Sequence, residues 1–99
     1  MLEKLNHSDF AGHLNTKFRV VETAEPFELE LVEISEPRTN RGQEYFSLLF
    51  RGADTTFLPQ KLYELEHETL GRGSLFLVPI GKSDGSFQYE AVFNRLKKD

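Results

Sequence analysis

Apolar and polar residues alternate along most of the chain, and a period of two predicts β-strands. In residues 27–31, Phe and Leu alternate with Glu, and the apolar phase slips by one position at Val32, as a β-bulge would produce. Residues 45–50 are apolar on both faces, which favours a central strand or the wall of a barrel. Residues 62–67 alternate again, and His67 falls on the inward face of that strand.

The remaining segments predict one helix and the connections between strands. Residues 8–14 offer an N-cap serine followed by Phe10 and Leu14 one turn apart, which predicts a short N-terminal helix. Residues 51–60 form the longest irregular connection. The Gly-Arg-Gly sequence at 71–73 indicates a tight turn, because no helix follows it as a dinucleotide-binding loop would require.

The last two strands, within residues 75–80 and 87–93, are predicted to form a hairpin. Closing it at Asp84-Gly85 places three apolar residues of each strand opposite one another on one inward face: Phe76 with Phe93, Val78 with Ala91, and Ile80 with Tyr89. That register gives Pro79 a ladder position that needs an N–H. A four-residue loop over 83–86, or a bulge near Pro79, is therefore expected.

The composition indicates one folded domain over residues 1–99. The chain has 99 residues, nine Phe, three Tyr and no Trp, enough aromatic bulk for one core. The expected fold is mainly β: a small antiparallel barrel or sandwich of about six strands, lying between about residues 18 and 94. One short helix precedes the strands, and residues 95–99 are expected to form a frayed basic tail.

Charge and cysteine content limit the partners and the cellular compartment that we expect. The formal net charge is −4 and no broad basic surface is evident, so we expect no nucleic-acid partner. There is no cysteine, no run of apolar residues of signal-peptide length and no membrane-spanning stretch. The sequence therefore predicts a cytoplasmic protein without a membrane partner.

The segment Leu65-Glu66-His67-Glu68 resembles the start of a zinc-protease helix. Such a site needs His-Glu-x-x-His on a helix, so that both imidazoles reach one metal. The second histidine position is Gly71, and the local period is two. His67 is therefore predicted to be a scaffold residue on a strand. His7 and His13 are expected to be surface histidines, since their spacing does not place them on one helical face.

No catalytic constellation is evident. Thiol chemistry is excluded by the absence of Cys, and no serine lies in a Gly-x-Ser-x-Gly elbow. The carboxylate pairs Glu28/Glu30 and Glu64/Glu66 lie on the polar faces of strands, where solvated side chains are expected. We predict no catalytic residue, no cofactor and no metal, and hence a protein that is not an enzyme.

The apolar sequence Phe57-Leu58-Pro59 stands out within a polar connection. It has two interpretations: a plug that caps the open end of a barrel, or an exposed contact with a partner protein. These three residues are the candidate partner contact.

Several segments, in order and spacing, resemble a family of short bacterial proteins classed as a domain of unknown function. They are Leu5-x-x-x-Asp9-Phe10, residues 46–52, residues 58–71, residues 75–81 and residues 89–94. Lys61 departs from the pattern, since a glycine is expected after Pro59-Gln60. The resemblance implies a small β-rich module without assigned activity. It also implies an accessory or structural role beside short fibre proteins resembling phage tail collars.

Two main functions follow. The first is a non-enzymatic protein-interaction or structural accessory module, associated with a phage-tail or fibre-like assembly or with a second copy of itself. The alternative is a small-ligand-binding β-barrel carrier, with Phe76, Tyr89 and Phe93 lining its interior. A third, an enzyme that uses carboxylates alone, would need a carboxyl group with a raised pKa.

Overall fold

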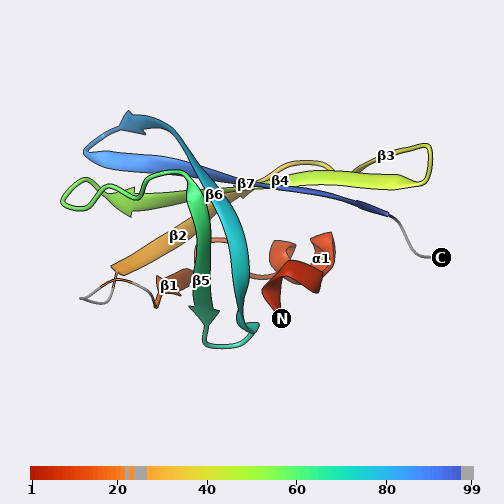
Figure 1. The fold of residues 1–99 in the computed structure, drawn as a ribbon, viewed down its shortest axis with the longest axis horizontal. Coiled ribbons are helices and arrows are strands. Elements are labelled where there is room, and N and C mark those ends of the chain that lie inside the picture. The colour runs from red at the N-terminus through yellow and green to blue at the C-terminus, as the bar shows by residue number, and fades with distance from the viewer. Residues whose placement is uncertain (22, 24–26, 97–99) are drawn as a thin grey trace.

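The computed structural model describes residues 1–21, 23 and 27–96. The N-terminal segment forms a 3-10 helix, η1 (Leu2–Lys4), and a short α-helix, α1 (His7–Ala11). The rest is β-structure (Figure 1), with strands β1 (Lys17–Val20), β2 (Phe27–Ile34), β3 (Arg38–Asn40), β4 (Gln43–Ala53), β5 (Lys61–His67), β6 (Gly71–Ser83) and β7 (Ser86–Leu96).

The strands form one antiparallel sheet that closes on itself. Their order is β2-β1-β5-β6-β7-β4-β3, and a further pairing of β2 with β4 closes six strands into a barrel. β3 lies outside the barrel and pairs with the N-terminal end of β4. This confirms the expected mainly β fold with about six barrel strands, and it decides for the barrel over the sandwich.

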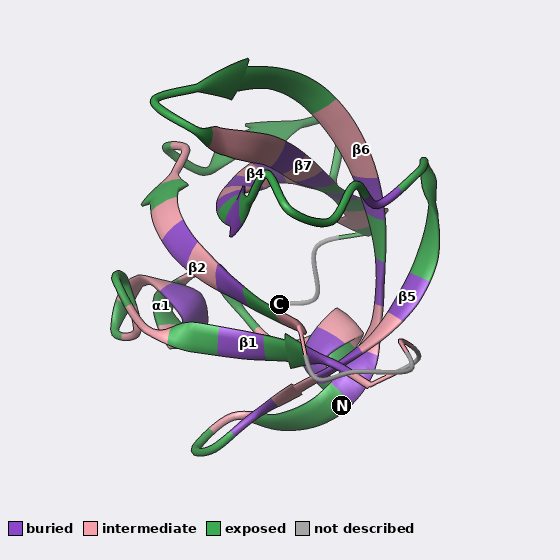
Figure 2. Cartoon of the chain, turned by 90° about the vertical axis from the view of Figure 1, so that its left-hand side faces the viewer, coloured by how far each residue is buried: buried purple, intermediate pink, exposed green. Residues whose placement is uncertain are grey.

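The inward side chains of all six barrel strands form one apolar core, seen as buried segments along the strands in Figure 2. At one end, Phe46 and Phe93 stack with ring centroids 4.6 Å apart, and Phe10 of α1 packs 5.3 Å from Phe93. Leu2 of η1 is fully buried in the same cluster. The N-terminal segment therefore contributes directly to the core.

Two predicted strand patterns are confirmed. The register of β2 against β4 shifts between Leu31 and Glu33, so the phase slip in the sequence is a β-bulge. In β5, Tyr63, Leu65 and His67 are all buried, as the alternation predicts.

The predicted pairing of β6 with β7 is correct next to the turn, from Gly81 to Ser83, and wrong farther from it. The hairpin turns at Asp84-Gly85 with Ser83 opposite Ser86, but the register shifts between Pro79 and Gly81. Pro79 therefore lies opposite Tyr89, and Leu75 and Leu77 point into the core while Phe76 and Ile80 are exposed. A bulge near Pro79 was one of the two expected ways to accommodate this proline, and it inverts the predicted faces of β6.

Some predicted boundaries also change. The helix spans His7–Ala11 instead of residues 8–14, and β4 runs to Ala53, so the long connection covers residues 54–60. The tight turn lies at 68–70, and β6 already begins at Gly71, whose φ is +92°. Arg95 and Leu96 belong to β7 rather than to a frayed tail, and the rest of the predicted tail lies outside the described residues.

Candidate functional site

An apolar pair stands on the outer face of the barrel wall. Leu62 of β5 and Phe76 of β6 lie directly opposite each other in the antiparallel ladder, and their side chains remain 55% and 48% exposed. Both point outward because the core-facing positions of their strands are taken by the neighbouring Tyr63, Leu75 and Leu77. Cross-strand pairing holds the two side chains side by side on a rigid wall.

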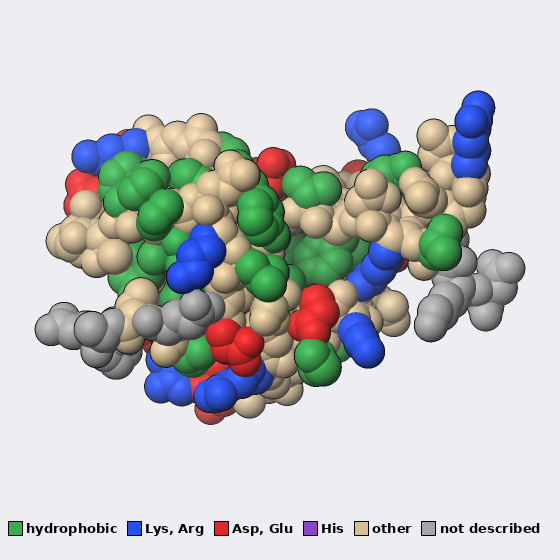
Figure 3. Space-filling model, viewed as in Figure 1, with side chains coloured by type: hydrophobic (Ala, Val, Ile, Leu, Met, Phe, Trp, Pro, Cys, Tyr) green, Lys and Arg blue, Asp and Glu red, His purple; other side chains and the backbone are tan. Residues whose placement is uncertain are grey.

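The apolar surface continues onto β7. Val92 is 63% exposed, and it lines the same depression between β6 and β7 as Phe76, with a volume of about 210 Å³. We call Leu62, Phe76 and Val92 the outer apolar face. Figure 3 shows apolar side chains exposed on the side of the molecule where β6 crosses in front of β7.

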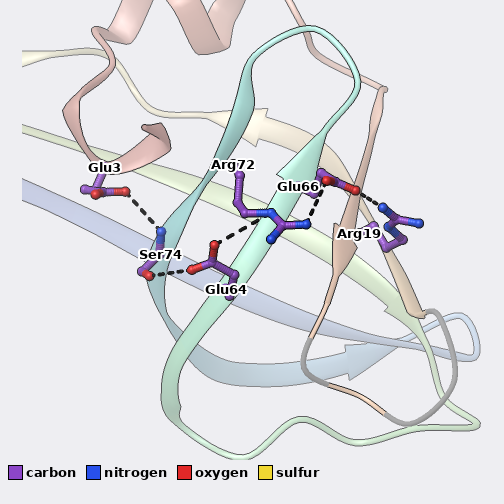
Figure 4. A network of polar contacts seen from close by, with 6 residues as sticks. All are labelled: Glu3, Arg19, Glu64, Glu66, Arg72 and Ser74. Atoms are coloured by element: carbon purple, nitrogen blue, oxygen red, sulfur yellow. Dashed lines mark hydrogen bonds and ion pairs between the residues drawn. The ribbon is translucent and has the colours of Figure 1, made fainter.

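The other half of the β5–β6 outer surface is charged (Figure 4). Arg72 donates to Glu66 at 3.0 Å, and the Arg19 guanidinium pairs with the same carboxylate. Ser74 donates its hydroxyl to Glu64 and its main-chain N–H to Glu3, each at 3.0 Å. These groups satisfy one another, so the charged half has the character of a solvated strand face, as predicted for Glu64 and Glu66.

The predicted contact segment divides into an inner and an outer part. Leu58 is buried, and its N–H donates to the hydroxyl of Tyr89 at 3.0 Å, so this residue caps the barrel end. The Pro59 carbonyl accepts the hydroxyl of Tyr63 at 2.6 Å. Phe57 is exposed and packs edge-to-face on Phe87, with centroids 5.1 Å apart. Of the three predicted residues, Leu58 contributes to the core, while Phe57 and Pro59 face solvent.

Burial also changes the chemistry of the Tyr89 hydroxyl. Removal from water raises the pKa of Tyr89, and the N–H donated by Leu58 offsets part of that rise. The phenol therefore stays protonated and serves as a fixed hydrogen-bonding group beneath the cap.

His67 lies inside the barrel end as a neutral imidazole. Its Nδ1 accepts the main-chain N–H groups of Thr69 and Leu70, both at 3.0 Å, so the proton must lie on Nε2. Nε2 in turn donates to the Thr16 hydroxyl at 2.9 Å. Burial lowers the pKa of His67, and the nearby His13 lowers it further. Both ring nitrogens are engaged, which gives His67 the structural part that the strand pattern predicts.

The other two histidines are more enclosed than surface histidines. Nε2 of His7 lies 2.8 Å from the Ser35 carbonyl oxygen, and its ring meets Phe46 edge-on. Nδ1 of His13 lies 3.0 Å from the Asp9 carbonyl oxygen, and its ring stands edge-on to His67. Among the residues that the structure describes, no group of three or more His, Cys, Asp or Glu side chains is placed to hold a metal ion.

Glu30 of β2 lies between two basic side chains. Arg51 donates to Glu30 at 2.8 Å, and Lys17 lies 3.7 Å away. The hydrogen bond from Arg51 holds the pKa of Glu30 below its usual range, with further help from Lys17. Glu30 is therefore kept ionised, whereas a general acid needs a raised pKa.

The residues proposed to line a ligand cavity do not share one face. Tyr89 and Phe93 are buried within the core, but Phe76 points to solvent because of the register shift in β6. Tyr89 is packed without exposed surface and Phe93 stacks on Phe46. Phe76 and Phe93 do line one depression of about 210 Å³, together with Val92, but it lies on the surface between β6 and β7 and does not include Tyr89.

The fold and the site define a small closed antiparallel β-barrel with an exposed apolar face on its wall. The chain belongs to the family described as a domain of unknown function (DUF6916), whose model matches residues 5–93. Comparison with curated proteins and with solved structures finds no match. Within the described residues, no helix has the length and apolarity needed to cross a membrane.

Sequence reasoning missed the outer apolar face, although one signal for it was present. The inward positions Tyr63, Leu65 and His67 place Leu62 on the polar side of β5, next to Glu64 and Glu66. A single exposed leucine is common on protein surfaces, so this signal gains meaning only together with the neighbouring apolar side chains. No comparable signal existed for Phe76, because its direction depends on the bulge.

Proposed function

We propose that this chain is a non-enzymatic protein-interaction module that docks onto a partner protein through the outer apolar face. The observation that carries the proposal is the cross-strand pair of Leu62 and Phe76, held half-exposed on a rigid barrel wall. Binding surfaces of this kind combine apolar anchors with a polar rim. Here the charged network around Glu64, Glu66 and Arg72 forms the rim.

The energetics support docking over simple exposure. Fully burying a Leu or Phe side chain contributes about 1.5–3 kcal/mol, so covering the exposed half of each residue adds roughly 1 kcal/mol apiece. Val92 adds a similar amount from the adjacent strand. Because strand pairing already fixes the backbone at these positions, binding has to order only the side chains and not the chain that carries them.

The setting we propose is a phage-tail or fibre-like assembly in a bacterial cytoplasm, in which this module is an accessory or structural component. Membership of the DUF6916 family supports a shared architecture. The assembly is proposed by association, from the resemblance to short proteins encoded beside collar-like fibres, and not from a residue of this chain. A fibre-like protein repeats its surface, and an apolar patch on a rigid barrel wall suits contact with such a regular surface.

An enzymatic function has less support. The ring nitrogens of His67 are both occupied by hydrogen bonds, and the pKa of Glu30 is shifted in the direction that keeps it ionised. The carrier alternative has no specific observation in its favour, since Phe76 points outward and Tyr89 and Phe93 are packed in the core.

The test uses a photo-crosslinking phenylalanine analogue at position 76 of the full chain, exposed to native bacterial lysate. We expect one crosslinked protein, identified by mass spectrometry as fibre-like. That protein is then purified, and its binding to the wild-type chain is compared with binding to the Leu62→Ser/Phe76→Ser variant. Loss of two anchors is expected to weaken binding about tenfold or more.

The matched control is Leu14→Ser, which removes an apolar side chain that is also exposed but lies outside the barrel wall. This variant is expected to bind as the wild type does. Capture of no protein from position 76, or binding that is insensitive to the Leu62→Ser/Phe76→Ser change, would count against docking at this face.

A further inference from the structure

Three strands continue beyond the barrel as a ribbon. The ribbon consists of β3, the first half of β4 and the end of β7, which lie side by side and project away from the barrel (Figure 1). The whole molecule measures 42 × 25 × 23 Å. β6 takes no part in the ribbon, because its pairing with β7 ends at Val78 and Glu90 and it then turns toward β5. Residues 91–96 of β7 thus form an edge.

The direction of the main-chain groups along this edge follows from Ser47. The Ser47 N–H donates to the Ser35 hydroxyl at 2.8 Å, and the Ser47 carbonyl accepts the Ser35 N–H at 3.0 Å. Both main-chain groups of Ser47 thus point away from β7. Since Ser47 lies opposite Val92, the main-chain groups of Val92 likewise point away from β4.

Alternate residues of a strand point the same way, so the N–H and C=O groups of Asn94 and Leu96 also face the open edge. Within the described ranges, these groups have no strand partner. Two of the three side chains along this edge are apolar and exposed, Val92 at 63% and Leu96 at 73%, and Asn94 between them is exposed and polar. An edge of this kind is a template for a further strand.

The opposite edge of the ribbon is different. β3 is only three residues long, all of them exposed and polar, and it follows Pro37. Short, charged edges with a nearby proline are the usual protection against unwanted pairing. The contrast identifies the edge of β7 as the one suited to binding.

We propose that residues 92–96 of β7 pair antiparallel with the same residues of a second copy of this chain, across a two-fold axis at Asn94. In this register Asn94 lies opposite Asn94 of the second copy, and Val92 lies opposite its Leu96. All of these residues present their main-chain groups to the edge, so each opposed pair exchanges both hydrogen bonds. The result is one continuous sheet across the two ribbons.

The edge segment is complementary to itself in this arrangement. Its outward side chains read apolar, polar, apolar from Val92 through Asn94 to Leu96. A two-fold axis at the central residue therefore places apolar against apolar and amide against amide. This symmetry argues for a second copy as the occupant. The interface shares Val92 with the outer apolar face but uses neither Leu62 nor Phe76, the pair that carries the proposed docking of the partner protein.

The chain has no cysteine, which allows a direct test of the register. Opposed residues in a hydrogen-bonded antiparallel pair have Cα atoms about 5.5 Å apart, a separation that a disulfide spans. Under mild oxidation, the Asn94→Cys variant is expected to run as a covalent dimer of twice 11.4 kDa. Thr39→Cys is the matched control on β3: it also lies at a free edge of the ribbon, and is expected to remain largely monomeric.

A second variant tests the hydrogen bonds. Asn94→Pro removes an N–H that has no hydrogen-bond partner among the residues that the structure describes, so the fold is expected to be retained, as circular dichroism can verify. We expect the dissociation constant of the dimer, measured by analytical ultracentrifugation, to rise on the order of tenfold or more. Thr39→Pro removes the equivalent N–H on β3 and should leave the dimer unchanged.

Wild-type protein that stays monomeric up to about 1 mM would overturn the proposal. So would a dimer that is unaffected by Asn94→Pro together with an Asn94→Cys variant that forms no disulfide. The Leu62→Ser/Phe76→Ser variant is expected to dimerise normally, so failure of partner docking and failure of dimerisation give separate results.

Discussion

The imidazole of His67 accepts the main-chain N–H of Leu70 at 3.0 Å and thereby ties the end of β5 to the turn that leads into β6. A protonated imidazole has no lone pair on Nδ1 and cannot accept this bond. On the other side, the Thr16 hydroxyl that His67 contacts donates to the His13 carbonyl at 2.5 Å. One neutral side chain thus joins the β5–β6 turn to the connection between α1 and β1.

Stability is expected to fall in mild acid because of this contact. The pKa of His67 is lowered by burial and by His13, with Glu68 opposing in part. The unfolded chain therefore takes up the proton first, at a pKa of about 6.5. Above that pH, His67 should add no pH dependence to the free energy of unfolding. It should then decrease by at most about 1.4 kcal/mol per pH unit as the pH falls toward the lower folded pKa.

Urea denaturation from pH 7.5 to 5 measures this slope. The His67→Gln variant keeps a side-chain oxygen that can accept an N–H but does not titrate, so its slope over the same range is expected to be smaller. An equal slope in wild type and variant would assign the acid sensitivity to other groups.

The contact between Tyr89 and Leu58 gives a second prediction. Tyr89→Phe removes the acceptor and leaves the buried N–H of Leu58 without a partner, at a cost of about 1–3 kcal/mol in the free energy of unfolding. Tyr45→Phe is the control, because its hydroxyl donates to Gln43 in a part-buried position on the ribbon. Chemical denaturation of the two variants should show the larger loss for Tyr89→Phe.

Gly73 is where β6 makes room for the N-terminal segment. A Cβ at this position would overlap the main-chain nitrogen of Leu2, which cannot rotate away. We expect Gly73→Ala to displace η1 and to cost about 1–3 kcal/mol, as overpacked positions do. Hydrogen exchange at the N-terminus should accelerate.

Gly81→Ala provides the comparison for that variant. A Cβ at Gly81 meets no heavy atom within 4 Å, so the change in stability should be small. If both alanine variants are equally stable, the packing of η1 against β6 does not contribute as the structure indicates.

Arg95 joins the end of β7 to the N-terminal segment. Its guanidinium donates to the main-chain carbonyls of Glu3 and Leu5, pairs with Glu44, and lies 5.2 Å from the Phe93 ring centroid. Arg95→Lys keeps the positive charge but loses the planar guanidinium, with its several N–H donors and its contact with the Phe93 ring. A loss of about 1–2 kcal/mol is expected by urea denaturation. Arg38→Lys on the exposed strand β3 should have little effect.

The local pattern of the sequence determined the strands and several of their faces. Alternation in residues 62–67 was enough to place His67 inside, and the phase slip at Val32 was enough to locate the bulge in β2. These features depend on neighbours along the chain, since a half-buried strand must alternate whatever it pairs with. For the last hairpin the sequence left two possibilities open, and the structure selects the two-residue turn at Asp84-Gly85 with a bulge near Pro79 over the four-residue loop at 83–86.

Only the tertiary structure decided which side of β6 faces the core, and with it the outer apolar face. Residues 75–80 are apolar on both sides, so alternation gives no direction, and the register shift near Pro79 turned Phe76 outward. The open edge of β7 was equally hidden. It exists because barrel closure draws β6 away from Val92, and closure depends on long-range pairing that no local pattern encodes.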